Sequence, residues 1–121
     1  MDQSGGYVTT HVLDTTRGQP AAGLRIDVYR LDGPARRQLA SMATNADGRT
    51  DAPVIAGPDI AEAEFELVFH VGDYLDLTHG PAGTVRFLDI VPIRFGVSDA
   101  GQHYHVPLLL SPFGYSTYRG S

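Results

Sequence analysis

Apolar residues recur at every second position in several short runs of the chain, which is the period of a β-strand with one buried face. In residues 7–14, Val8 and Val12 share one side of the predicted strand, while His11 lies on the other side. Similar runs, each of strand length and rich in β-branched and aromatic residues, occupy residues 24–32, 36–45, 51–55, 61–71, 84–98 and 103–110. A last strand follows a turn at residues 112–114. The pattern predicts seven or eight short strands.

The only helix that the pattern favours spans about two turns, over residues 73–79. Residues 15–23 are predicted to form a loop, and Pro92 interrupts the long strand 84–98, which indicates an edge strand or a bulge there. Many short strands separated by 14 Gly and 8 Pro are typical of an all-β protein. We therefore expect an antiparallel β-sandwich, with a small closed barrel as the alternative.

The composition narrows the possible chemistry. The chain has 121 residues, enough for one domain, and no Cys, which excludes disulfides, thiolate metal sites and a Cys nucleophile. Its nine basic residues are all Arg, so a lysine Schiff base is excluded as well. A formal charge of −5 argues against a nucleic-acid partner, because phosphate contacts need clustered cations.

The termini suggest where the folded domain begins. Residues 1–6 are read as a flexible arm, and residues 7–121 as the domain. The first residues show no basic segment followed by an apolar one, and no run approaches the ~20 apolar residues of a membrane span. We expect a cytoplasmic protein with no membrane partner.

Face assignment separates the five histidines into two groups. His103 and His105 alternate with the apolar positions of residues 103–110, so both are predicted to point outward, as does His11. A sheet face that carries these imidazoles is either solvated or covered by another subunit. His70 and His79 are assigned to the ordinary solvated surface.

Two further segments carry candidate chemistry. The turn Asp47-Gly48-Arg49 projects an arginine from the end of a hairpin, although an Asp-Gly turn followed by a surface Arg is also common. The chain closes with residues 118–121, YRGS, directly after the last strand. Such an end is either a frayed tail or a docked, functional terminus.

Three motifs in this order resemble one family. THVLD at 10–14, NADGR at 45–49 and YHVPLLLSPFGYSTYRGS at 104–121 are similar to segments of the 5-hydroxyisourate hydrolases, also called transthyretin-related proteins. The resemblance implies a transthyretin-like sandwich of two four-stranded sheets, with a short helix between the fifth and sixth strands. It also implies a homotetramer, a dimer of dimers, whose active sites lie in the channel between the dimers.

The resemblance further implies the reaction and its residues. The substrate is 5-hydroxyisourate, the product of urate oxidation, whose cyclic amide is hydrolysed to 2-oxo-4-hydroxy-4-carboxy-5-ureidoimidazoline without metal or organic cofactor. Catalytic positions carry over to His11, Arg49, His105 and Ser121, and substrate-binding positions to His11, Arg49, His105, Tyr118, Arg119 and Gly120.

The residue types suit this chemistry. A neutral imidazole of His11 or His105 takes a proton from water, and the residues alone do not say which one is the base. The Arg49 guanidinium stabilises an oxyanion, Tyr118 offers a ring for stacking, and Ser121 positions water or substrate.

Three other functions fit parts of the sequence. One is a non-catalytic carrier on the same fold. Another is a zinc hydrolase that uses the nitrogens of His11, His103 and His105, although a neighbouring Arg cation would repel the metal. The third is a secreted adhesion-type sandwich, which the missing Cys and signal segment argue against.

Overall fold

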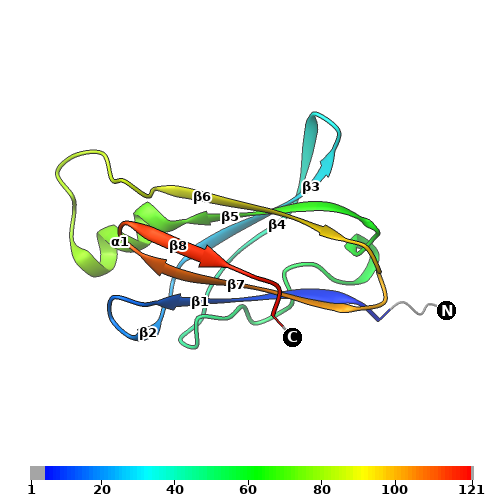
Figure 1. The fold of residues 1–121 in the computed structure, drawn as a ribbon, viewed down its shortest axis with the longest axis horizontal. Helices are drawn as coiled ribbons and strands as arrows, with labels where there is room; N and C mark the ends of the chain where they lie inside the picture. The colour runs from blue at the N-terminus through cyan, green and yellow to red at the C-terminus, as the bar shows by residue number, and fades with distance from the viewer. Residues whose placement is uncertain (1–4, 121) are drawn as a thin grey trace.

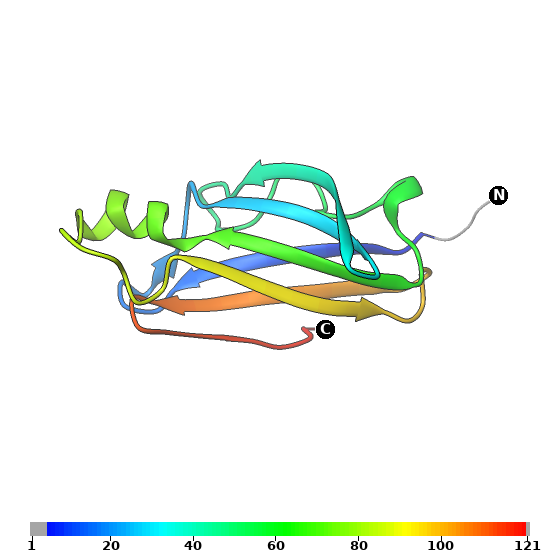
Figure 2. The ribbon, with the colours of Figure 1, turned by 90° about the horizontal axis from the view of Figure 1, so that it is seen from above.

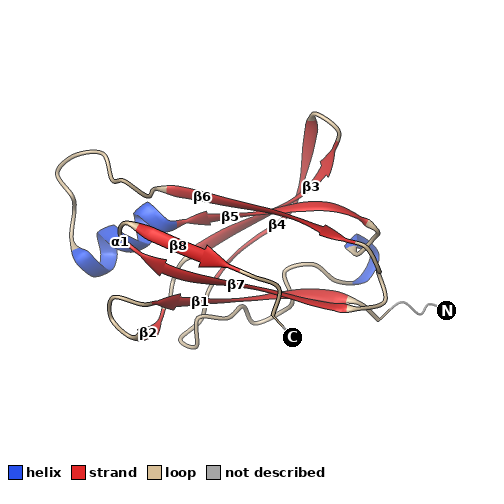
Figure 3. Ribbon diagram, in the orientation of Figure 1, coloured by secondary structure: helices blue, strands red, loops and turns tan. Residues whose placement is uncertain are grey.

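The computed structural model describes residues 5–120, which form two four-stranded sheets packed face to face (Figures 1 and 2). One sheet has the strand order β2-β1-β7-β8 and the other has the order β4-β3-β5-β6. The elements, shown in Figure 3, are β1 (Tyr7–Asp14), β2 (Gln19–Pro20), β3 (Arg25–Asp32), β4 (Ala35–Ala43), η1 (Gly57–Asp59), β5 (Ala63–His70), α1 (Val71–His79), β6 (Ile90–Val97), β7 (His103–Ser111) and β8 (Gly114–Thr117). The predicted sandwich with one short helix is confirmed.

One strand pair departs from the predicted antiparallel arrangement. β1 and β7 run parallel, with Tyr7 opposite His103 and Thr9 opposite His105, whereas the other described strand pairs are antiparallel. Hydrophobic alternation assigns the two faces of a strand, but it does not set the direction of the neighbouring strand. The parallel register places the outward side chains of β1 and β7 in two adjacent rows on one face of the sheet.

The core between the sheets follows the predicted alternation. Val8 and Val12 of β1, Leu108 of β7 and Phe65 and Phe69 of β5 are fully buried. Burial of each such side chain contributes about 1.5–3 kcal/mol to folding. Because alternate positions turn inward, the histidines of β1 and β7 face outward, as predicted.

One predicted strand is absent, and another is shorter than predicted. Residues 51–55 are not a strand, and Ile55 makes only an isolated bridge to Val8. The strand predicted over 84–98 begins at Ile90, because the segment before it forms a loop after the helix.

The other irregular segments agree with their residue types. Pro92 lies in β6, at the edge of its sheet, where its missing amide hydrogen costs no ladder hydrogen bond. Within the predicted loop 15–23, Gln19 and Pro20 pair with the end of β1 as the two-residue strand β2.

A buried carboxylate ties α1 to the end of β1. Asp14, which is 1% exposed, accepts hydrogen bonds from the Tyr74 hydroxyl at 2.7 Å and from the backbone N–H groups of Thr16 and Arg17 at 3.1 Å. Burial raises the pKa of Asp14, but the bonds from Tyr74, Arg17 and His79 outweigh it and hold the pKa below its usual value. The network anchors the helix at one end of the sandwich, opposite the end where the described chain begins (Figure 2).

The predicted arm at residues 1–6 lies mainly outside the described part of the chain. Gly6 is buried, and its Cα faces the backbone of Ala100 and Gln102. Within residues 5–120, no helix combines the length and apolar character needed to cross a membrane.

Candidate active site

A pocket of about 320 Å³ opens on the outward face of β1 and β7. Segment 49–53, which follows the turn after β4, forms its other wall. The lining residues are Tyr7, Thr9, Thr10, Arg49, Thr50, Asp51, Ala52, Pro53, His103 and His105. The pocket therefore brings together Arg49 and His105 from segments that are far apart in the sequence.

The turn before Arg49 is held by the side chain of Asn45. Its Oδ1 accepts from the backbone N–H groups of Asp47 and Arg49 at 2.9 and 3.2 Å, and its Nδ2 donates to Asp51 at 2.9 Å. The backbone N–H of Asn45 also donates to the carbonyl of Arg49 at 2.7 Å. These contacts make the turn a rigid base for the guanidinium.

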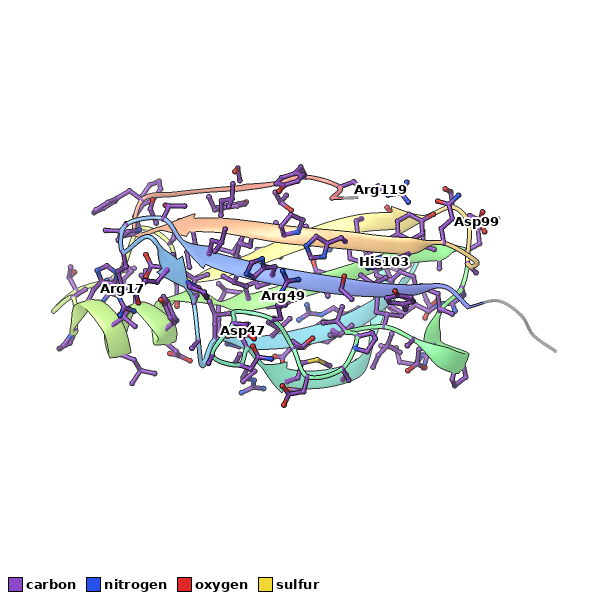
Figure 4. The ribbon with its side chains drawn as sticks, turned by 90° about the horizontal axis from the view of Figure 1, so that it is seen from below. Arg17, Asp47, Arg49, Asp99, His103 and Arg119 are labelled. Carbon is purple, nitrogen blue, oxygen red and sulfur yellow. The ribbon has the colours of Figure 1, made fainter. Side chains whose placement is uncertain are left out.

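Gly48 docks this turn on β1. The Val12 N–H donates to the Gly48 carbonyl at 2.8 Å, and Gly48 has a φ of +75°. A Cβ at this position would lie 2.4 Å from the Val12 carbonyl oxygen, so no other residue fits without displacement. The backbone contact places Arg49 beside the outward row of β1, and Figure 4 shows Arg49 next to that strand.

The two histidines of β7 meet on a threonine. The Thr9 Oγ1 lies 2.8 Å from Nδ1 of His105 and 2.7 Å from Nε2 of His103. The His103 ring stacks on Tyr7, with centroids 4.3 Å apart and planes 18° from parallel. In the parallel β1–β7 register, Tyr7 lies opposite His103 and Thr9 lies opposite His105, which is why the four side chains meet.

His105 is surrounded by positive or potentially positive groups. Burial lowers the pKa of His105, and the charges of Arg49, His103 and His11 lower it further, while a hydrogen bond to the Thr9 backbone acts in the opposite direction and does not outweigh them. His11, which was predicted to share the site, lies two residues after Thr9 on the same outward row of β1, but it is not among the residues that line this pocket. A half-buried imidazole that is kept neutral can accept a proton at neutral pH.

The chain end docks on β7 instead of fraying. The Gly120 N–H donates to the His105 carbonyl at 2.8 Å. Arg119 lies 4.2 Å over the Tyr104 ring and donates to Gln102 Oε1 at 2.9 Å. A Cβ on Gly120 would lie 2.6 Å from Cδ2 of His105, so the glycine backbone packs directly against the imidazole.

The other tail residues predicted for the site are placed differently. Tyr118 and Arg119 line a separate pocket of about 260 Å³ with Arg94 and Phe95 of β6. Ser121, predicted as catalytic, lies outside the described residues. The proposed contacts of Tyr118 and Ser121 with substrate therefore stay predictions.

The prediction that His70 and His79 belong to the ordinary solvated surface is wrong, because each lies beside a buried carboxylate. His70 Nε2 lies 2.9 Å from Asp27, and His79 Nε2 lies 3.5 Å from Asp14. Neither lines the pocket that contains His105.

The sequence pattern did not identify Thr9, Tyr7 and Asn45 as parts of the site. Thr9 and Tyr7 have the same parity as His11, so their outward position was visible in the sequence. Their contact with the β7 histidines was not, because it depends on the parallel register. The zinc alternative needs three convergent ligands, and no group of three His, Cys, Asp or Glu side chains within residues 5–120 is arranged to hold a metal ion.

The fold and the site define a β-sandwich protein with a histidine–arginine pocket on the outer face of one sheet, an arrangement suited to acid–base chemistry on a small polar molecule. Residues 8–120 match the profile of the HIUase/Transthyretin family. The chain belongs to this family.

Individual relatives and structures agree with that assignment. The chain is 61% identical to the 5-hydroxyisourate hydrolase of Mesorhizobium japonicum, over 97% of this chain and 94% of that protein. The structure of Klebsiella pneumoniae 5-hydroxyisourate hydrolase is similar with a TM-score of 0.76 and 33% identity, over 95% of this chain and 99% of that chain. A crystal structure of (S)-allantoin synthase is similar with a TM-score of 0.90 and 40% identity, over 100% of this chain and 46% of that longer chain.

Proposed function

We propose that this protein is a 5-hydroxyisourate hydrolase that opens the cyclic amide of its substrate with a water molecule. The observation that carries the proposal is one pocket in which a half-buried imidazole, His105, faces an arginine held by a rigid turn. The hydrolase names of close relatives support the choice of substrate.

The first step is attack of water on the amide carbonyl carbon. Water is a weak nucleophile at neutral pH, and a positioned base typically contributes about 10²–10⁴-fold to the rate. We assign this role to His105, because burial and the neighbouring cations lower its pKa and keep the imidazole neutral. The Thr9 contact at Nδ1 leaves Nε2 as the nitrogen that takes the proton.

The second step is collapse of the tetrahedral intermediate. The Arg49 guanidinium stabilises the oxyanion, a contribution commonly worth about 10²–10³ in rate. The C–N bond then breaks, and the leaving nitrogen receives a proton from His105 or from protonated His11. Ring opening yields the carboxylate of the ureidoimidazoline product, so the overall reaction adds one water and needs no redox partner.

The protein is proposed to act as a homotetramer, a dimer of dimers, with Tyr118 and Ser121 completing each site in the channel. An exposed apolar cluster supports association, since Val85, Phe87 and Phe113 are 90%, 74% and 78% exposed. Light scattering is expected to give about four times 13.0 kDa. A fully active monomer would contradict the shared channel.

The direct test is turnover of freshly generated 5-hydroxyisourate. His11→Ala, Arg49→Ala and His105→Ala are each expected to lose at least about 10²-fold in kcat/KM while remaining folded. His70→Ala and His79→Ala are matched controls outside the pocket and should stay near wild type. Wild-type protein without turnover, or full activity in His105→Ala, would contradict the proposal.

Two further expectations have simple tests. A chelator should leave the rate unchanged if imidazoles act without a metal, whereas loss of activity that added zinc restores would favour a metalloenzyme.

We also propose a cytoplasmic location, in keeping with a chain that has no Cys to form disulfides. Cell fractionation against marker proteins tests it.

A further inference from the structure

The Thr9 hydroxyl lies between the two histidines of β7. The reaction described above uses Thr9 only as the partner of His105 Nδ1 and gives His103 no role. Its oxygen is 2.8 Å from Nδ1 of His105 and 2.7 Å from Nε2 of His103. Both distances are those of strong hydrogen bonds.

A hydroxyl has one proton to donate, so two imidazole nitrogens that both bond to it cannot both act as acceptors. If Thr9 donates to His103, then His105 must donate its Nδ1–H to Thr9. If Thr9 donates to His105, then His103 must donate its Nε2–H. When the Thr9 proton lies between the two rings, the hydroxyl therefore links the tautomer of one ring to the tautomer of the other.

The two arrangements differ in what His105 offers to a substrate. In the first, Nδ1 carries the proton and Nε2 has a free lone pair that can accept a proton. In the second, Nε2 carries the proton and the free lone pair points at Thr9. Only the first arrangement gives a general base at Nε2.

We propose that Thr9 and His103 form a relay that holds His105 in the Nδ1–H tautomer and carries positive charge away from it during turnover. When Nε2 of His105 takes a proton from the attacking water, the Nδ1 proton passes to the Thr9 oxygen. The Thr9 proton passes in turn to Nε2 of His103. One proton enters the relay at His105 and one extra proton resides on His103, so charge and atoms balance. The proposal rests on the hydrolase function and deepens it.

The charges around the two rings favour this direction. Arg49 and His11 disfavour a cation on His105, which is half-buried. Asp51 is the acidic residue that lines the same pocket. His103 is exposed, so water solvates its charged form. The Tyr7 ring stacked on it at 4.3 Å adds cation–π stabilisation, typically about 0.5–1 kcal/mol at exposed sites.

Arg119 is a permanent cation that contacts the backbone of His103. Its guanidinium is held over the Tyr104 ring, and it contacts His103 through the backbone carbonyl at 3.4 Å. Figure 4 shows His103 and Arg119 as side chains of different segments, β7 and the tail. Thr9 and His103 are thus positioning residues that act through His105.

The test compares Thr9→Val, which removes the hydroxyl at nearly constant shape, with Thr9→Ser, which retains it. A third variant, His103→Phe, keeps a ring beside Tyr7 but removes the nitrogen. Nitrogen-15 NMR of the whole protein reports which nitrogen of neutral His105 carries the proton. We expect Nδ1–H in wild type and in Thr9→Ser, and a shift toward Nε2–H in Thr9→Val.

Kinetics provide the second readout. Thr9→Val is expected to lower kcat about 10-fold, which is part of the 10²–10⁴-fold that a positioned base contributes. KM should change little, and the acid limb of the pH profile should be altered. His103→Phe should lose less, because Thr9 still accepts from Nδ1, and Thr9→Ser should stay within about twofold of wild type. Thermal midpoints should remain close to wild type, since both positions face outward.

The outcomes separate this proposal from the hydrolase function. An Nε2–H tautomer in wild-type protein, or Thr9→Val with unchanged NMR signals and an unchanged pH profile, overturns the relay. An Nδ1–H tautomer that depends on the Thr9 hydroxyl supports the relay's tautomer control even if 5-hydroxyisourate is not turned over, a result that would overturn the function alone.

Discussion

Gly120→Ala is a sharp test of how the chain end serves the site. The Gly120 N–H bonds to the His105 carbonyl, and an added Cβ would lie 2.6 Å from Cδ2 of that imidazole. Ordinary contacts begin near 3.4 Å. The ring or the tail must therefore move by roughly 0.8 Å, a displacement close to the ~1 Å that can cost 10²-fold in a positioned catalytic group.

We expect Gly120→Ala to lower kcat/KM by about 10- to 100-fold. Folding should be almost unaffected, because Gly120 lies at the surface end of the chain and is not among the described glycines with positive φ. Gly114→Ala is the matched control, since a Cβ there meets only the Ser111 Oγ at 3.8 Å. The assay is turnover of 5-hydroxyisourate beside a thermal midpoint for each variant.

The result also distinguishes a role of the tail in positioning His105 from a role in stability. Wild-type turnover in Gly120→Ala would show that the tail does not set the position of His105. A large fall in the thermal midpoint would instead assign the tail to stability. Loss of turnover in both glycine variants would point to a general sensitivity of β8 and the tail after it to substitution.

Three further predictions test other parts of the structure. Gly48→Ala should destabilise the protein by about 2 kcal/mol or more in a denaturant titration, because its φ of +75° and its close backbone contact both exclude a Cβ. Arg49→Gln should raise the pKa of His105, because the substitution removes one of the charges that lower this pKa. The acid limb of kcat/KM should then move to higher pH, and an unmoved limb would reject His105 as the base. Tyr74→Phe should cost about 1–2 kcal/mol of unfolding free energy, because buried Asp14 loses a 2.7 Å donor, and a smaller change would show that water replaces it.

The glycines at 48 and 120 share one physical role in the candidate site. Each lets a backbone segment approach a strand that carries a histidine: Gly48 at Val12, next to His11, and Gly120 at His105. Both glycines lie in motifs that were visible in the sequence. The structure shows why glycine is needed at each position: a Cβ would collide with the neighbouring strand or its side chain. The same chemistry on a looser backbone would leave Arg49 and His105 free to drift apart.

Local sequence patterns were enough to predict most of the strands, the helix and the faces of β1 and β7. Alternation alone identified β1 and β7, their inward apolar residues and the outward direction of the histidines, because a strand's side-chain period is a local property. The helix at the end of β5 was likewise predicted from local rules, and Pro92 indicated an edge strand or a bulge, of which the structure shows the edge.

Tertiary structure decided which outward residues meet. The parallel register places Thr9 opposite His105 and Tyr7 opposite His103, and an antiparallel pairing of the same strands would have brought other residues together. The docking of Gly48 on β1 and of Gly120 on β7 is equally non-local. So is the lowered pKa of His105, which results from burial and then from charges on three segments. Strand direction and long-range contacts depend on how the whole chain packs, and a two-residue period along one strand carries no information about them.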